Sequence, residues 1–181
     1  MLDIPGIFSL YYNDNPELLS TVATHSECVA RKALACLQEK GIEADMEFVK
    51  EAALLHDIGV VKCHAPSIFC YGDLPYICHG VEGRKMLDSL DLHRHALVCE
   101  RHTGSGLTIE DIERQNLPLP HRDMCPVSIE EKAICYADKF FSKSGSLTEE
   151  KPLEKVIRQM EKFGEASLRR FLYLHSIFGC E

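Results

Sequence analysis

Apolar residues recur at helical spacing through almost the whole chain, and this periodicity limits what the chain can fold into. They follow one another at intervals of three and four residues over 18–37, 48–55, 77–90, 92–102, 129–141 and 153–178. This spacing is typical of helices that bury one face, and the strict alternation that is typical of strands is nearly absent. The sequence therefore predicts an all-α fold, a bundle of about five to seven helices.

Capping residues indicate where several of these helices begin and end. Residues 15–17, Asn-Pro-Glu, favour the start of a first helix, which we expect to run to Gly41. Asp45 favours the start of a second helix, and Gly59 is expected to end it. Residues 128–131, Ser-Ile-Glu-Glu, resemble a capping box that opens a later helix.

Three stretches lack this periodicity. Residues 1–14 are expected to be irregular. Residues 60–76 contain two prolines and predict a loop with one short turn of helix, and residues 103–127 predict a second long loop with at most a brief helix at 109–115. Long loops often shape a binding site, so we expect substrate specificity to come from the two long segments.

Composition bears on the size and the partners of the protein. The chain has 181 residues, of which 45% are hydrophobic, and this is enough for one substantial core. We expect a single domain over 1–181, with a core at about 16–145 and a C-terminal helix at about 150–179 that packs on it. A formal net charge of -8 argues against a protein that grips the backbone of a nucleic acid over a wide surface.

The cysteines and the N-terminus indicate the cellular compartment in which the protein is expected. Nine cysteines are present, none of them in a C-x-x-C pair, and their odd number in a long chain favours free thiols in a reducing compartment. The N-terminus lacks the basic and apolar regions of a secretory signal, and no stretch reaches the roughly 18 apolar residues that a membrane span needs. These features predict a soluble, cytoplasmic protein with no nucleic-acid or membrane partner.

The strongest chemical signal lies at residues 54–59, Leu-Leu-His-Asp-Ile-Gly, which place His56 and Asp57 at the end of an apolar helix. Burial of such a pair without partners is costly, which argues against an ordinary capping role. Other imidazole and carboxylate groups lie on or beside four further predicted helices, namely His25, His79, His102 and Asp138. Proteins use these groups as ligands for transition metals, and helix bundles build metal sites from side chains on several helices.

In this order, His25, His56-Asp57, His79, His102 and Asp138 resemble the HD superfamily of metal-dependent phosphohydrolases, including its His-Asp-Ile-Gly motif at 56–59. The resemblance covers about residues 20–145. It implies an HD-domain-like bundle in which His25, His56, Asp57 and Asp138 bind one metal ion. For members with two metals, it implies that Asp57 bridges the ions and that His79 and His102 hold the second. Residues 78–80 and 100–103 also resemble HD enzymes that cleave dinucleoside polyphosphates.

The resemblance further implies a reaction and its cofactors. The expected reaction is hydrolysis of a phosphomonoester, a phosphodiester or a nucleotide phosphoanhydride by a metal-activated hydroxide, which Asp57 orients. Glu82, three residues after His79, is a candidate acid, base or supporting residue. The expected cofactors are one or two divalent transition-metal ions from among Fe, Mn, Ni, Co and Zn. The expected partner is a small phosphorylated substrate such as a nucleotide, and the oligomeric state stays open.

Basic residues near the predicted ligands are candidates for contacts with the substrate, because phosphate needs donors beyond the metal ions. These residues are Lys62, Arg101, Lys139 and Lys143. We rank Lys62 first, as a catalytic or substrate-binding residue, because it closely follows the motif. Lys139 ranks last, because helical geometry turns it about 100° away from Asp138 and toward solvent.

Other interpretations stay open at this point. His25 by itself is typical of a hydrogen-bonded core histidine, and His79 and His102, which single-metal members lack, are also consistent with surface positions. A di-iron HD-type oxygenase resembles this chain in its ligand types, so the ligands alone do not separate it from a hydrolase. A non-catalytic nucleotide-binding module that keeps the fold is a third class, against which the intact His-Asp pair argues.

Overall fold

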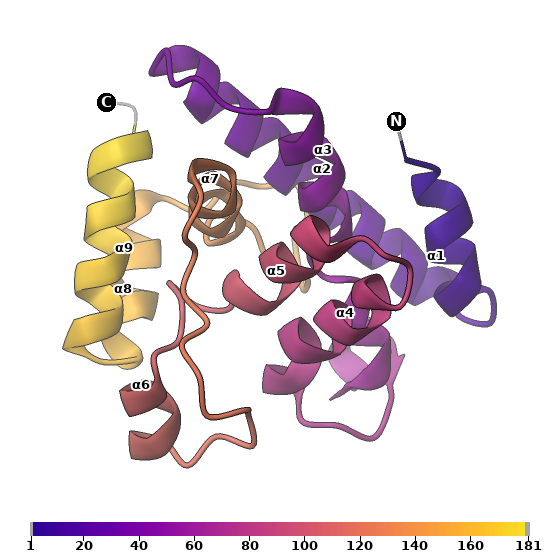
Figure 1. Ribbon diagram of the computed structural model, residues 1–181. Coiled ribbons are helices and arrows are strands. Elements are labelled where there is room, and N and C mark those ends of the chain that lie inside the picture. The colour runs from indigo at the N-terminus through magenta and orange to yellow at the C-terminus, as the bar shows by residue number, and fades with distance from the viewer. Residues whose placement is uncertain (1, 180–181) are drawn as a thin grey trace.

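Helices form almost all of the regular structure, which confirms the predicted all-α class (Figure 1). The computed structural model describes residues 2–179. Within that range the α-helices are α1 (Ile4–Tyr12), α2 (Pro16–Glu39), α3 (Met46–Leu55), α4 (His79–Asp88), α5 (His93–Arg101), α6 (Ile109–Arg114), α7 (Ile129–Asp138), α8 (Leu153–Lys162) and α9 (Glu165–Phe178). Short 3-10 helices occupy Ile58–Lys62 (η1), Pro66–Ile68 (η2) and Tyr76–Cys78 (η3), and strand β1 (His64–Ala65) pairs antiparallel with β2 (Cys70–Tyr71).

The described residues hold more α-helices than predicted, for two reasons. The prediction of an irregular N-terminus is wrong for α1, which begins where the Asp3 carboxylate accepts a hydrogen bond from the amide of Gly6 at 3.0 Å. The single helix predicted at the C-terminal end is divided into α8 and α9 by Gly164, whose φ of 106° lies in a region that favours glycine. The apolar periodicity continues across that break, so the pattern alone does not reveal it.

The segment 60–76 also holds more regular structure than the predicted loop with one turn of helix. The β1–β2 pair closes a short hairpin, and Phe69 reaches the left-handed region with a φ of 63°. The thiol of Cys70 donates to the carbonyl oxygens of Val60 and Cys63, at 2.6 and 2.7 Å. Strands of two residues are too short to give an alternating pattern, which explains why the sequence did not predict them.

The predicted starts of three helices form as expected. A side-chain oxygen accepts from the backbone amide three residues later in each case: Asn15 from Leu18, Asp45 from Phe48 and Ser128 from Glu131. Only half of the predicted capping box forms at the last of these. The carboxylate of Glu131 accepts from the amide of Val127 at 2.8 Å and from Arg101, rather than from the amide of Ser128.

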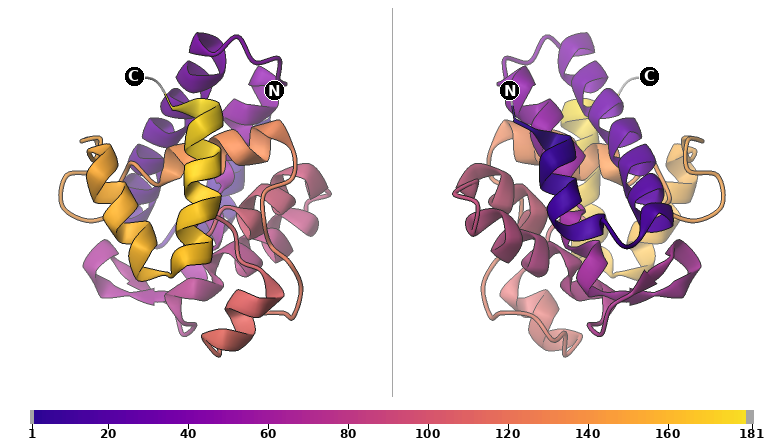
Figure 2. Two further views of the ribbon diagram at one scale, coloured as in Figure 1. Left: turned by 90° about the vertical axis from the view of Figure 1, so that its left-hand side faces the viewer. Right: turned by 90° about the vertical axis from the view of Figure 1, so that its right-hand side faces the viewer.

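The long helix α2 lies against α3 and α7, and α4 packs on α5. The pair of α8 and α9 lies on one side of the molecule and α1 on the other (Figures 1 and 2). Buried apolar residues form one large group among α2, α3, α7 and α9 and another among α1, α2, η1, α4 and α5. Along α2, His25 lies between Val22 of the second group and Val29 of the first, so its imidazole is held where the two groups meet.

Gly59 does not end α3, contrary to the prediction, because α3 ends at Leu55 and Gly59 lies within η1. A Cβ atom at Gly59 would lie 2.1 Å from the carbonyl oxygen of His79 and 2.2 Å from the amide nitrogen of Gly83. Glycine is therefore required by the close approach of η1 to α4. This contact sets the distance between the segments that carry Asp57 and His79.

The eight cysteines within the described range are free thiols, and seven of them are buried. Cys180 lies outside the described residues. Among residues 2–179, none of the helices combines the length and the apolar character that crossing a membrane requires.

We expect Gly59→Ala to lower the free energy of unfolding by about 3 kcal/mol or more, because its Cβ meets backbone atoms that cannot move independently. Gly41→Ala is the matched control. Its φ is +63° but no atom lies within 4 Å of the added Cβ, so we expect a loss of only about 1–2 kcal/mol from backbone strain. Urea unfolding curves of both variants measure the difference, and equal losses would contradict the close approach.

Candidate metal centre

Six side chains converge where several helices begin or end. His25 lies within α2, His56 and Asp57 follow α3, His79 begins α4, His102 follows α5, and Asp138 is the last residue of α7. All six are at most 8% exposed. The structure therefore brings together the complete set of predicted ligands from five separate parts of the sequence.

The potential ligand atoms form two overlapping groups, within each of which they lie no more than 4.8 Å apart: His25, His56, Asp57 and Asp138, and then Asp57, His79 and His102. In the first group, Nε2 of His25 is 2.9 Å from Oδ1 of Asp138 and 3.3 Å from Oδ2 of Asp57. Nε2 of His56 is 3.0 Å from the same Asp57 oxygen. Ligand atoms about 2.1 Å from one metal ion lie about 3–3.5 Å from each other, so these separations suit a shared cation.

Asp57 belongs to both groups, and its two carboxylate oxygens face different ones. Oδ2 faces His25 and His56, whereas Oδ1 is 3.5 Å from Nε2 of His79 and 3.5 Å from Nε2 of His102. The Nε2 atoms of His79 and His102 are themselves 3.1 Å apart. A carboxylate in this orientation can bind one cation with each oxygen.

Three of the histidines share one hydrogen-bond pattern. Each Nδ1–H donates to the carbonyl oxygen three residues earlier: His56 to Ala53 at 2.6 Å, His79 to Tyr76 at 2.7 Å and His102 to Cys99 at 2.8 Å. Each residue is the C-cap of a helix, where carbonyl groups of the last turn lack amide partners. In the neutral ring this bond assigns the proton to Nδ1 and leaves the lone pair of Nε2 directed at the cluster, as a metal ligand requires.

The two groups differ in charge. Burial opposes ionisation of Asp57, but His56 and Lys143 outweigh burial and hold the pKa of the carboxyl well below its usual range. Burial also disfavours the charged form of His56, but the neighbouring carboxylates raise its pKa to about 9. In the second group, burial and then the adjacent His102 lower the pKa of His79 to about 3, and burial lowers the pKa of His102. The second pair of histidines is therefore neutral at physiological pH, which suits metal ligation.

Several polar atoms of the cluster are buried without a hydrogen-bond partner. Among the described residues, none forms a well-aligned hydrogen bond with Nδ1 of His25, with Nε2 of His56 or with either oxygen of Asp57. Each buried polar atom left in this state costs about 1–3 kcal/mol. A divalent cation in the cluster would satisfy Nε2 of His56 and both Asp57 oxygens, so these residues fit a metal ion.

Lys143 is the basic residue that contacts the shared carboxylate. Its Nζ lies 2.7 Å from Oδ2 of Asp57, an ion-pair contact, and its ammonium is hydrogen-bonded to Tyr76. The ring of Tyr76 lies 4.7 Å from that of His79. Tyr76 was not predicted as a site residue, because an aromatic residue in a loop of low periodicity gives no signal of its own.

Lys139 also lies at the cluster, and the prediction that it faces solvent is wrong. It is only 8% exposed, its Nζ is 2.6 Å from Oδ2 of Asp138, and it donates to the carbonyl oxygen of His102 at 3.0 Å. The 100° rotation of an ideal helix does not decide its position, because Lys139 is the C-cap of α7 and its long side chain reaches back over the helix end.

The other predicted substrate contacts lie elsewhere. Lys62 is exposed in η1, and none of its contacts within the described range reaches the cluster. Arg101 donates to both carboxylate oxygens of Glu131 at 3.0 Å and so joins α5 to α7. Glu82 pairs with a neighbouring lysine at 2.6 Å. The structure thus favours Lys143 over Lys62, because closeness in sequence does not show that the segment after α7 returns to Asp57.

Comparisons with known proteins bear on the same residues. The profile of the family described as HD domain matches residues 22–142, a range that contains all six residues of the cluster. An uncharacterized protein of Methanocaldococcus jannaschii is 34% identical over 154 residues, which are 83% of this chain and 80% of that protein.

Two proteins named tRNA (cytidine(56)-2'-O)-methyltransferase are also similar to this chain. That of Picrophilus torridus is 37% identical over 102 residues, which are 56% of this chain and 26% of that protein. That of Thermoplasma volcanium is 31% identical over 147 residues, which are 80% of this chain and 38% of that protein. This chain therefore spans well under half the length of either methyltransferase. No solved structure matches it.

The pH dependence of stability tests the neutral state of His79 in the metal-free chain. Its folded pKa of about 3 lies below the ordinary value of 6.5, so the stability that neutral His79 contributes is present above pH 6.5 and is lost as the pH falls toward 3. Between pH 7 and pH 5 we expect the native chain to lose about 2 kcal/mol more than His79→Asn. Urea unfolding at both pH values measures this difference, and parallel losses in the two proteins would refute it.

Proposed function

Because this chain belongs to the HD domain family, we propose that it is a metal-dependent hydrolase of phosphate esters or anhydrides. The proposed substrate is a small phosphorylated molecule, with a nucleotide as the leading candidate. One observation carries the proposal: the Asp57 carboxylate is completely buried between two groups of ligand atoms, with one oxygen toward each.

Each group has a proposed ion. His25, His56, Asp57 and Asp138 would hold the first, and Asp57, His79 and His102 would hold the second. This mixture of imidazole and carboxylate donors suits Fe, Mn, Co, Ni and Zn. A bound divalent ion would lower the pKa of a coordinated water toward about 7 and neutralise charge on the phosphoryl oxygens.

The residues of the chain prepare the site for that chemistry. The backbone carbonyls that accept from Nδ1 of His56, His79 and His102 fix the direction of the three rings. Lys139 pairs with Asp138 and so holds that carboxylate in place. The ammonium of Lys143 lies beside Asp57 and is proposed to donate to a phosphoryl oxygen of the substrate.

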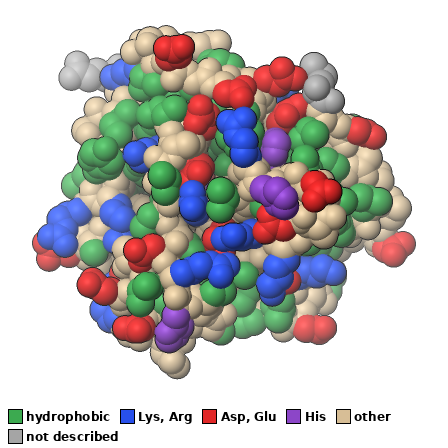
Figure 3. All heavy atoms as spheres, viewed as in Figure 1, with side chains coloured by type: hydrophobic (Ala, Val, Ile, Leu, Met, Phe, Trp, Pro, Cys, Tyr) green, Lys and Arg blue, Asp and Glu red, His purple; other side chains and the backbone are tan. Residues whose placement is uncertain are grey.

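Methyl transfer to tRNA is not proposed for this chain. The two methyltransferases are matched over only 26% and 38% of their lengths, so most of each lies outside the similar part. Acidic and basic side chains are interspersed on the face shown in Figure 3, and the net charge of -8 does not favour a wide contact with a nucleic-acid backbone. These features support a small phosphorylated substrate.

Two other functions use the same ligand types and are distinguished by experiment. A di-iron oxygenase would consume dioxygen when loaded with iron and would show a mixed-valent iron signal, whereas a hydrolase would turn over phosphate esters with Mn, Ni or Zn and without dioxygen. A non-catalytic module would bind nucleotides tightly and would not turn over with any divalent metal. A panel of phosphate esters and dinucleoside polyphosphates, screened against several metals, separates the three.

Metal content tests the bridging position of Asp57. We expect about two ions per native chain, fewer than about 0.2 in Asp57→Asn, and about one in His79→Ala, because only Asp57 belongs to both groups. Inductively coupled plasma mass spectrometry measures the ions, and phosphate release measures turnover, which we expect to disappear in Asp57→Asn and in His56→Ala. His64→Ala is the matched control, since His64 is exposed in β1 and should retain both metal and activity.

Full phosphate release by Asp57→Asn or His56→Ala would refute the proposed function. Equal metal loss in His79→Ala and Asp57→Asn would refute the proposal that Asp57, His79 and His102 hold an ion separate from the first. Circular dichroism spectra of each variant show whether the fold is kept.

Substitution of the two candidate lysines tests the contact with phosphate. We expect Lys143→Gln to lower kcat/KM about 10- to 100-fold, because it removes a charge-assisted hydrogen bond of about 1.5–3 kcal/mol. Lys62→Gln should change kcat/KM less than about twofold, since Lys62 is exposed and outside the cluster. Steady-state kinetics on the best substrate of the panel measures both variants, and a larger loss in Lys62→Gln would reverse the assignment.

A further inference from the structure

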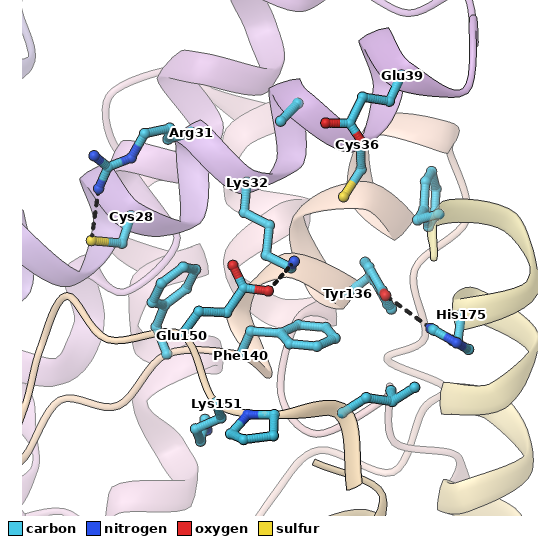
Figure 4. Close-up of a pocket in the computed structure, with 15 residues that line it drawn as sticks. Cys28, Arg31, Lys32, Cys36, Glu39, Tyr136, Phe140, Glu150, Lys151 and His175 are labelled. Atoms are coloured by element: carbon cyan, nitrogen blue, oxygen red, sulfur yellow. Dashed lines mark hydrogen bonds and ion pairs between the residues drawn. The ribbon is translucent and has the colours of Figure 1, made fainter. Parts of the chain in front are cut away.

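A cavity lies apart from the metal cluster. It has a volume of about 600 Å³ and lies between α2, α7, the segment 150–153 and the end of α9 (Figure 4). Small-molecule sites commonly have volumes of about 300–1,000 Å³. None of the six cluster residues lines this cavity.

The cavity lies further along the helix that carries His25. Lys32 and Cys36 both line it and follow His25 by seven and eleven residues. With a rise of about 1.5 Å per residue, they lie about 10 and 16 Å farther along the axis of α2. A molecule in this cavity would therefore be near the cluster but would contact different side chains.

The inner wall of the cavity is aromatic. It includes Tyr136, Phe140, Phe141 and Phe178, each at most 8% exposed. The hydroxyl of Tyr136 is hydrogen-bonded to Nδ1 of His175 at 2.9 Å, and Figure 4 shows these two side chains directed at each other. Such a wall offers apolar and aromatic contacts to a flat ring.

One cation of the cavity lies directly over this wall. The Nζ of Lys32 is 4.2 Å from the centroid of the Phe140 ring and 2.5 Å from a carboxylate oxygen of Glu150 (Figure 4). The Lys32 side chain is 17% exposed, whereas that of Glu150 is 51% exposed. The ammonium is therefore fixed within the cavity, and its carboxylate partner lies at the edge, where another anion can replace it.

Two further cations have neutral partners. Arg31 donates to the thiol sulfur of Cys28 at 3.1 Å, and Nζ of Lys151 donates at 3.3 Å to Oε1 of Gln159, which does not line the cavity. Lys32 is therefore the cation best placed to bind an anion there. Within residues 2–179, neither Arg31 nor Lys151 is within ion-pair distance of a carboxylate. Burial lowers the pKa of Lys151 to about 8, against the opposing effect of the Asp138 carboxylate.

We propose that this cavity is a second binding site, for a small anion that carries a flat aromatic ring, such as an aryl phosphate. The ring lies against the aromatic wall, and the anionic group pairs with Lys32 in place of Glu150. Glu150 competes with the ligand for Lys32. The site needs no metal ion and is independent of the proposed hydrolase activity.

Phenylphosphonate is a suitable probe, because it joins a flat ring to a dianion and has no ester bond to hydrolyse. We expect it to bind the metal-free full-length chain in isothermal titration calorimetry. Methylphosphonate, which lacks the ring, should bind at least about tenfold more weakly, since burial of the ring contributes more than about 1.4 kcal/mol.

Substitutions at the cavity give effects of opposite sign. Lys32→Gln should weaken the binding of phenylphosphonate about tenfold or more, whereas Glu150→Gln should tighten it several-fold by removing the competing carboxylate. A variant that is merely destabilised would not bind more tightly. Lys50→Gln, at an exposed lysine of α3 outside the cavity, is the matched control and should leave affinity unchanged.

Three outcomes would overturn the proposal. One is the absence of binding at millimolar phenylphosphonate. Another is equal affinity for methylphosphonate, which would exclude a contact with the aromatic wall. The third is a loss of affinity in Lys143→Gln without a loss in Lys32→Gln, which would place the probe at the metal cluster instead.

Discussion

The buried carboxylate of Asp57 is the group on which the arrangement of the helices depends. A carboxylate with no exposed surface is tolerated only when opposite charges or strong donors surround it, because the loss of hydration costs several kcal/mol. Here His25 and His56 face one oxygen, His79 and His102 face the other, and Lys143 approaches from the segment after α7. These partners come from α2, α4, the ends of α3 and α5, and a loop, so the environment of one side chain fixes how five parts of the chain meet.

The directions of the helices add to this electrostatic environment. The C-terminal ends of α3, α5 and α7 all lie at the cluster, where His56, His102 and Asp138 follow or form their last turns. A helix C-terminus carries a partial negative charge of about half an electron, which favours a nearby cation. Three such ends, together with the Asp57 and Asp138 carboxylates, make this a region of negative potential, although the two lysines offset part of it. The same helix ends supply the free carbonyls that orient two of the imidazole rings, so backbone geometry and ligand chemistry favour the same cation.

The sequence predicts the features that are set by interactions between neighbouring residues better than those set by contacts between distant segments. The helical period and the side chains of Asn15, Asp45 and Ser128 act locally, and they predict the main helices and their starts. The six residues of the cluster are also predictable, from residue types, their order and the resemblance to the HD superfamily. The lysines are not, because the return of Lys143 to Asp57 and the backward reach of Lys139 depend on the path of a loop. The division of α8 from α9 and the two-residue strands escape prediction as well, since neither changes the apolar pattern over a full helical turn.

The segment that follows α7 links the two parts of the molecule where charge is concentrated. The amide of Lys151 donates to the carbonyl of Phe140 at 2.8 Å, so the ends of this segment are held together at the base of a loop. Along it, Lys143 pairs with Asp57 of the metal cluster, and Glu150 pairs with Lys32 of the cavity beside α2. Ion pairs respond to any new charge placed nearby: a cation at Asp57 repels Lys143, and an anion beside Lys32 repels Glu150. Both pairs restrain one short segment, so the positions of Lys143 and Glu150 depend on charges in two separate parts of the molecule.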